Sequence, residues 1–402
     1  MTLRISINKL RYALVFALLF FAAMNFKAKF FYFVFAALIS LGILQRRLLI
    51  NAGSLVYLAL GVLMAVYNYD EGVLSMVRCL APLSLYLVGY NITAIMEGKA
   101  QDFAFDEDAA KRTGYFLLIS ISAGSFFHYI LNFATNYNKF LGRNTIDIWT
   151  GSVMAATGQA TLACLMLGLS VAMIFAPKKR SHRWIGAISI VCMIAYNLVL
   201  AGRTLFVVLL VLFAVAILYM RKSLTTKGGK LKLFIGCIMT VLSLAVAYFY
   251  NLFGLRSYIS QSNFFNRFGA SLDMFAEDSS RASSKWAFIV NSLEYPFGGL
   301  KLREQYGYAH DLLLDGYDEY GLFGFLLLVS VLALGVWELY KFLRFTSYSH
   351  ELKLAYLCVY VSVLLIFCVE PILAGMPWLF ACYCLINGCL TGMNMAHFSK
   401  KQ

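Results

Sequence analysis

The sequence predicts an all-α integral membrane protein with about twelve transmembrane helices. Hydrophobic residues make up 61% of the 402 residues and charged residues only 13%, about half the charged share of ordinary globular proteins. The mean hydropathy is +0.73. Apolar runs of roughly 16–26 residues are separated by short charged clusters, and a helix needs about 20 apolar residues to cross the hydrocarbon core. Since every backbone polar group in lipid needs an internal partner, these runs are predicted helices.

Twelve runs satisfy this length criterion. The short alternating segments of a membrane β-barrel are absent. The predicted spans are 10–25, 28–45, 48–67, 73–95, 113–135, 151–176, 183–201, 203–220, 232–253, 320–343, 352–374 and 377–396.

The lysines and arginines of the connecting loops predict the orientation. With the N-terminus inside, 22 of the 34 lysines and arginines fall in inner segments, as the positive-inside tendency requires. The loop at 177–183 and the segment at 221–232 contribute most strongly. Both termini are therefore expected on the cytoplasmic side of the membrane.

One long segment, 254–319, separates the spans and is expected on the outer face of the membrane. Its aromatic and amphipathic stretches predict short helices that lie on the membrane surface. The chain therefore divides into an N-terminal bundle of about nine spans (1–253), the outer loop (254–319) and three C-terminal spans of the same bundle (320–402).

Composition also excludes several classes of protein. The net charge of +14 is spread over many short loops, which indicates membrane topology and argues against nucleic acid as a partner. All nine cysteines fall in apolar runs, so neither a disulfide framework nor a zinc site is expected. The basic N-terminus followed by an apolar run resembles a signal peptide, but it lacks a small-residue cleavage site and is read as a retained first helix.

Arg203 is the most informative charged residue. It follows Ala201-Gly202 at a tight turn between two predicted spans, on the outer face. One interpretation is an arginine at a helix end whose head group reaches water. The other is an anion site, because the guanidinium presents a fork of donors that matches phosphate oxygens.

The outer loop offers a second pair of cations. Arg281 and Lys285 are four residues apart, so a helix would place both on one face. That face is either simply solvated or a second anion clamp. Weaker candidates for anion binding in the same loop are Arg256, Arg267, Lys301 and Arg303. Trp286 is one of the aromatic residues that could stack on sugar rings.

His310 is the only one of five histidines that falls in a predicted outer loop. Near neutral pH a histidine can accept a proton from a sugar hydroxyl; a surface or packing role is the alternative. Acidic residues follow it, namely Asp311, Asp315, Asp318 and Glu319. They are candidates to orient the histidine, to bind sugar hydroxyls or to bind a divalent cation. Because these four residues form no D-x-D motif, the metal is the less favoured use, and no cofactor is expected.

Arg78 lies inside the fourth predicted span. A charge at this depth must face the bundle interior or an aqueous cavity. It therefore either contributes to substrate binding or forms an internal ion pair, for which Glu370 is a possible partner.

Three short patches carry a resemblance to the O-antigen polymerase and O-antigen ligase superfamily of bacterial inner-membrane proteins. They are Ala201-Gly202-Arg203-Thr204; Arg281 and Trp286 followed by Tyr295-Pro296-Phe297-Gly298-Gly299; and Ala309-His310-Asp311-Leu312-Leu313-Leu314 with Glu319-Tyr320-Gly321-Leu322-Phe323-Gly324. The plan of about twelve spans with a large loop before the last spans is also similar. Asp311 departs from the family pattern, which has Asn there.

The resemblance implies a metal-independent glycosyltransferase that uses undecaprenyl-diphosphate-linked oligosaccharides at the periplasmic face. Arg203 and Arg281 would then hold the diphosphate, and His310 would be the base or would position the acceptor hydroxyl. Membrane lipid, a chain-length regulator and a flippase are the other expected partners. A polymerase of repeat units is favoured, a ligase that transfers finished chains to lipid A core is the alternative, and a flippase or other transporter is the third hypothesis.

Overall fold

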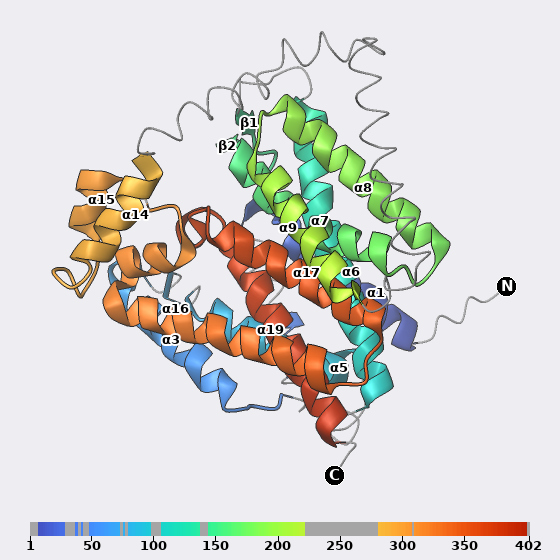
Figure 1. The fold of residues 1–402 in the computed structure, drawn as a ribbon. Coiled ribbons are helices and arrows are strands. Elements are labelled where there is room, and N and C mark those ends of the chain that lie inside the picture. Colours follow the sequence, from blue (N-terminus) through green and yellow to red (C-terminus); the bar gives the residue numbers. More distant parts are fainter. Residues whose placement is uncertain are drawn as a thin grey trace, which may run out of the picture.

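A computed structural model describes residues 7–28, 37–38, 42, 48–72, 75–76, 79–97, 106–136, 144–221, 280–307 and 309–399. Figure 1 shows a bundle of helices with one two-helix unit at one end. The helices are α1 (Ile7–Ala23), α3 (Gly53–Tyr67), α5 (Ala81–Glu97), α6 (Glu107–Asn136), α7 (Ala156–Phe175), α8 (Arg180–Val199), α9 (Thr204–Tyr219), α14 (Ser280–Asn291), α15 (Leu300–Tyr306), α16 (Leu312–Phe345), α17 (His350–Phe367), α18 (Ile372–Gly375) and α19 (Pro377–Ser399), with short 3-10 helices at Phe26–Ala28 and Tyr69–Glu71.

Six of these helices are long and apolar enough to cross a membrane: α6, α7, α8, α16, α17 and α19. The chain is therefore a helical membrane protein. Three shorter apolar helices, at Leu10–Ala23, Gly53–Tyr67 and Thr204–Tyr219, coincide with predicted spans, but 14–16 residues rise only about 21–24 Å. The predicted span at 232–253 lies outside the described residues, as does nearly all of the one at 28–45.

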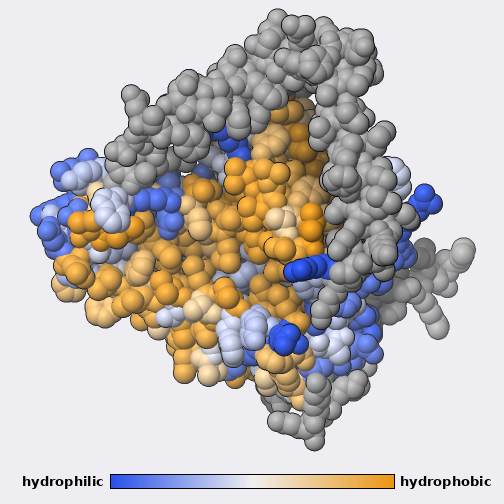
Figure 2. Space-filling model, in the orientation of Figure 1, coloured by the Kyte–Doolittle hydropathy of each residue, from blue (hydrophilic) through white to orange (hydrophobic). Residues whose placement is uncertain are grey.

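The apolar side chains that face away from the bundle form its lipid-facing surface. Figure 2 shows a broad hydrophobic band across the drawn face, with hydrophilic residues gathered at its margins. Leu210 on α9 is 70% exposed and Val191 on α8 is 64% exposed. Water would not tolerate so much exposed apolar surface, whereas lipid does.

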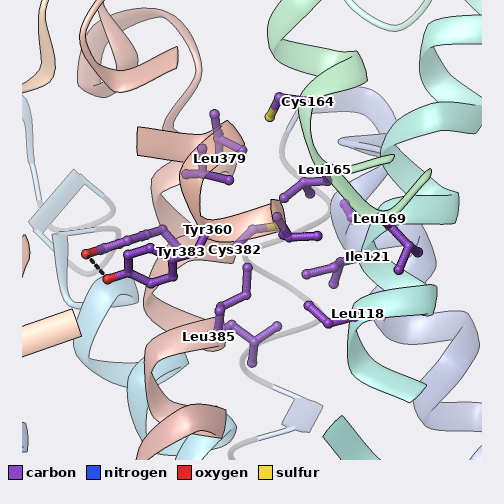
Figure 3. Close-up of a cluster of buried hydrophobic side chains, with 14 of the residues drawn as sticks. Leu118, Ile121, Cys164, Leu165, Leu169, Tyr360, Leu379, Cys382, Tyr383 and Leu385 are labelled. Atoms are coloured by element: carbon purple, nitrogen blue, oxygen red, sulfur yellow. Dashed lines mark hydrogen bonds between the residues drawn. The ribbon is translucent and has the colours of Figure 1, made fainter. Parts of the chain in front are cut away.

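The core forms where α19 packs on α5 and where α7 packs between α17 and α8. Leu118 and Ile121 of α6, Leu165 and Leu169 of α7, and the α19 residues Leu379 and Cys382 belong to one cluster of buried side chains (Figure 3). Tyr360 and Tyr383 are buried beside it, and their hydroxyls are 2.5 Å apart. This hydrogen bond satisfies two polar groups that lipid could not solvate.

Antiparallel packing of α7 and α17 defines two ends of the bundle. The Ser362 hydroxyl donates to the Cys164 carbonyl, and Gly168 lies against Val359. The N-terminus of α7 and the C-terminus of α17 therefore lie at the same end of the bundle. That end also carries α14 and α15, and we call it the α14 end. The opposite end carries Lys111, Arg112, Lys178, Arg344 and other cations, and we call it the basic end.

A small β-hairpin adds to the predicted helices. Strands β1 (Asn144–Ile146) and β2 (Val153–Ala155) pair antiparallel in the loop before α7. Asp147 in the turn accepts hydrogen bonds from the backbone N–H groups of Trp149 and Thr150. Its other oxygen is 2.7 Å from Nε2 of the fully buried His128 on α6. The hairpin is thus fixed onto α6 by a buried polar contact.

Candidate active site at the α14 end

The loop that contains the candidate residues folds as a unit with its own small core. Phe288 of α14, Leu302 of α15 and Tyr317 of α16 are buried together with Ala309 and Leu314. The hydroxyl of Ser284 donates to the Tyr306 carbonyl at 2.6 Å. Because these contacts join α14, α15 and the start of α16, the unit holds its side chains in fixed relative positions.

Helix α16 is broken at Gly321, which has φ 67° and ψ −167°. A Cβ there would lie 2.5 Å from the Pro296 carbonyl oxygen, so glycine is required both by the backbone and by this close approach. The break separates a first segment, 312–320, from the predicted span, which therefore continues from Leu322. The predicted start of the tenth span at residue 320 falls at this break.

The two glycine-containing patches that the sequence analysis singled out meet at this break. Leu322 N–H donates to the Pro296 carbonyl at 2.8 Å, and Gly299 N–H donates to the Asp318 carbonyl at 3.1 Å. The Tyr317 hydroxyl donates to the Tyr295 carbonyl at 3.1 Å. Residues 295–299 therefore pack directly against residues 317–322.

His310 precedes the first turn of α16. Its φ of 52° lies in the left-handed region, which histidine enters more readily than most residues. The side chain is half-buried. This conformation turns the chain between the buried Ala309 and the helix cap that follows.

Asp311 caps α16 and also pairs with Lys285. One carboxylate oxygen accepts the N–H of Leu313 at 3.0 Å, as an N-cap aspartate does. The other oxygen is 3.3 Å from Lys285 Nζ. Lys285 also donates to the Cys368 carbonyl at 2.7 Å, beyond the end of α17. Of the predicted residues, Lys285 and Asp311 are thus brought together, and His310 directly precedes Asp311 in the chain.

Two of the acidic residues further along are buried in the first segment of α16. Asp318 pairs with Arg303 of α15 at 3.1 Å, so the guanidinium of this weaker clamp candidate already has a carboxylate partner. Asp315 is 3% exposed. Among the described residues, one of its oxygens has no hydrogen-bond partner.

Glu319 lines a cavity of about 370 Å³ beside this segment. Asn68, Glu71 and Ser75 contribute polar groups, and Tyr320 and Phe380 contribute aromatic surface. Sequence reasoning missed Asn68, Glu71 and Ser75, because nothing in their spacing marks them; only the packing of α3 against α16 brings this part of the chain to Glu319.

Arg203 lies on a neighbouring part of the same end. It is exposed at the N-terminus of α9. Gly202 lies against Ala156 at the start of α7, and Gly158 lies against Met376 in the turn between α17 and α19. The same turn begins near Cys368, which accepts from Lys285. Arg203 is therefore at the same end of the bundle as the Lys285–Asp311 pair.

Trp286 is placed apart from this pair. It is 66% exposed and shares one face of α14 with Ile289 and Val290, which are also exposed. Arg281 lies in the first turn of α14, but its side chain is outside the described residues, as is all of Arg78. In the described ranges, no three His, Cys, Asp or Glu side chains are placed to hold a metal ion.

Fold and site together define a helical membrane protein with a polar cluster and a cavity at one end of its bundle. Comparison with protein-family models finds no match, and no curated protein matches the sequence. The function is therefore argued from the residues themselves.

Proposed function

We propose that this chain is a membrane glycosyltransferase that joins polyprenyl-diphosphate-linked oligosaccharide units, as a polymerase of a surface polysaccharide. The observation that supports the proposal is the Lys285–Asp311 pair at one end of the bundle, with His310 next to Asp311 in the chain. A cavity lined by Glu319, Glu71 and Asn68 belongs to the same end. Cations, an imidazole and carboxylates beside the membrane surface suit a substrate that has a lipid, a diphosphate and sugars.

In the proposed reaction, an acceptor sugar hydroxyl attacks the anomeric carbon of the donor. A new C–O bond forms, the bond from that carbon to the diphosphate breaks, and His310 accepts the hydroxyl proton. Negative charge grows on the departing diphosphate, and Arg203, Arg281 and Lys285 would stabilise it. By the predicted orientation, this chemistry takes place on the periplasmic face of the inner membrane.

The proposal is tested by a lipopolysaccharide gel from a strain that lacks only this chain. We expect lipid A core that carries a single repeat unit, without the ladder of bands from longer polysaccharide chains. Expression of the wild-type chain should restore this ladder. Core without any repeat unit, together with accumulated lipid-linked polymer, would instead indicate the ligase. An unchanged ladder would overturn both readings.

Complementation with His310 variants tests the site. His310→Gly keeps the left-handed backbone available and removes the imidazole, whereas His310→Ala also strains the backbone. Loss of a general base typically costs about 10²–10⁴ in rate, so both variants should lose the ladder. His350→Ala, at the basic end, is the matched control. A full ladder with His310→Gly in stably inserted protein would rule out the proposed role of the imidazole.

A further inference from the structure

A larger cavity, of about 550 Å³, lies at the basic end of the bundle. Its wall is apolar, formed by Phe116 and Ile119 of α6 and by Leu169 and Met173 of α7. Ile119 is 39% exposed while Leu169 is buried in the core, so the cavity runs from the lipid-facing surface to the interior. This volume is within the range of about 300–1,000 Å³ of small-molecule sites.

The polar lining of this cavity is at its mouth. Lys111 and Arg112 come from the first turns of α6, and Lys178 comes from the turn between α7 and α8. Lys178 Nζ lies 5.6 Å from the centre of the Tyr115 ring, and such cation–π contacts hold a lysine over its ring. Arg112 is 2.9 Å from Glu97, which also accepts from Tyr12 at 2.6 Å. The two lysines are thus placed at the mouth beside an ordered ion pair.

The charge around the mouth is predominantly positive. Two carboxylates, Asp108 and Glu351, also line the cavity. The chain continues from Lys178 through the exposed residues Lys179, Arg180 and Arg183. The lining holds three cations, Lys111, Arg112 and Lys178, against these two carboxylates, and Lys179, Arg180 and Arg183 add positive charge beside it. An anionic group is therefore favoured at the mouth, even with Arg112 paired to Glu97.

We infer that this cavity binds one anionic phospholipid, with its phosphate at Lys111 and Lys178 and an acyl chain along Phe116, Ile119 and Met173. A free anion would not use the apolar wall, and an uncharged lipid would not use the lysines. Basic pockets between membrane helices on the cytoplasmic side are suited to anionic head groups. The predicted orientation places this end at the cytoplasmic leaflet, and the site is separate from the polar cluster at the α14 end.

The test is native mass spectrometry of the purified full chain in detergent, titrated with phosphatidylglycerol. We expect one tightly bound copy, and phosphatidylcholine should bind more weakly. Lys111→Gln combined with Lys178→Gln should weaken phosphatidylglycerol binding roughly thirtyfold, from about 1 kcal/mol for each lysine near an anionic lipid. Arg221→Gln combined with Arg344→Gln removes the same charge from exposed positions that do not line the cavity, and should leave binding unchanged.

Ile119→Trp tests the wall without changing any charge. The larger side chain should fill the cavity and displace the acyl chain, so phosphatidylglycerol binding should fall while the protein remains monodisperse. Equal binding by the lysine pair variant and by the control variant would overturn the site. Equal binding of phosphatidylcholine would overturn the anionic head group. Competition by inorganic phosphate at millimolar concentration, with no effect of Ile119→Trp, would mean an anion site and not a lipid site.

Discussion

Asp311 shows how one residue can serve the start of a helix and the site together. Its carboxylate accepts the N–H groups of Leu313 and Leu314 and also faces Lys285. An Asn side chain at this position could accept the same backbone bonds. The Lys285–Asp311 pair is partly exposed, so its direct contribution to stability is small.

We therefore expect Asp311→Ala and Asp311→Asn to differ. Alanine removes the cap and should lower the free energy of unfolding by about 1 kcal/mol, whereas asparagine should retain most of it. Thermal unfolding of detergent-solubilised protein, followed by size-exclusion chromatography, measures the difference. Equal destabilisation by both substitutions would show that the charge, and not the cap, is what stabilises α16.

At the scale of elements, α5 and α19 pack closely because glycines line their contact. A Cβ on Gly388 would lie 2.0 Å from the Tyr86 carbonyl oxygen, and one on Gly89 would lie 2.1 Å from that of Leu385. Small residues allow this approach between membrane helices, where packing replaces the hydrophobic effect as the driving force.

Gly388→Ala should therefore force the two helices apart and destabilise the protein by about 1–3 kcal/mol. Gly375→Ala is the matched control, since the nearest atom to a Cβ there is 4.0 Å away. The measurement is the melting temperature of both purified variants. A melting temperature of Gly388→Ala equal to that of the control would contradict the close packing.

The hairpin of β1 and β2 gives a prediction for pH. Burial raises the pKa of Asp147, but the hydrogen bond and charge of His128 and the donors from Thr150 outweigh it and hold the pKa well below its usual range. A depressed carboxyl pKa stabilises the fold above the unfolded value of about 3.9, and this stabilisation is lost as pH falls toward the folded value. The free energy of unfolding of the wild-type protein should thus exceed that of Asp147→Asn at pH 7. This difference in free energy should become smaller below about pH 4. If this difference in free energy stayed constant from pH 7 to pH 3, the proposed interaction of Asp147 with His128 would be contradicted.

For the whole molecule, the two ends differ in charge and in structure. The α14 end carries the two-helix unit and the cavity of Glu319, and the basic end carries Lys178, Lys179 and Arg180. The positive-inside tendency predicts that the basic end faces the cytoplasm.

Single-cysteine labelling tests this orientation. In a background with the native cysteines replaced, we expect Glu294→Cys to react with a membrane-impermeant maleimide in intact spheroplasts. Lys179→Cys should react only after the membrane is permeabilised. Both positions are exposed in the structure, so the reverse pattern would invert the topology and move the proposed chemistry to the cytoplasm.

Hydrophobic run length determined the class of fold by itself, because a segment in lipid has few alternatives to a helix. The runs at 113–135, 151–176 and 377–396 correspond to α6, α7 and α19. Residue types and their predicted location also singled out Lys285, His310 and Asp311, and the structure pairs Lys285 with Asp311, which follows His310 in the chain. Local patterns could not reveal the break at Gly321, because its cause is the Pro296 carbonyl from a different segment of the chain.

Only the tertiary structure decided which polar groups meet across segments that are distant in sequence. Lys285 reaches the Cys368 carbonyl, Glu319 shares a cavity with Asn68 and Glu71, and Trp286 lies on an exposed face away from Lys285. The apolar content of each segment is a local property that the sequence determines directly. Contacts between segments depend on how helices pack, and packing is set by small residues and side-chain shapes on several helices at once.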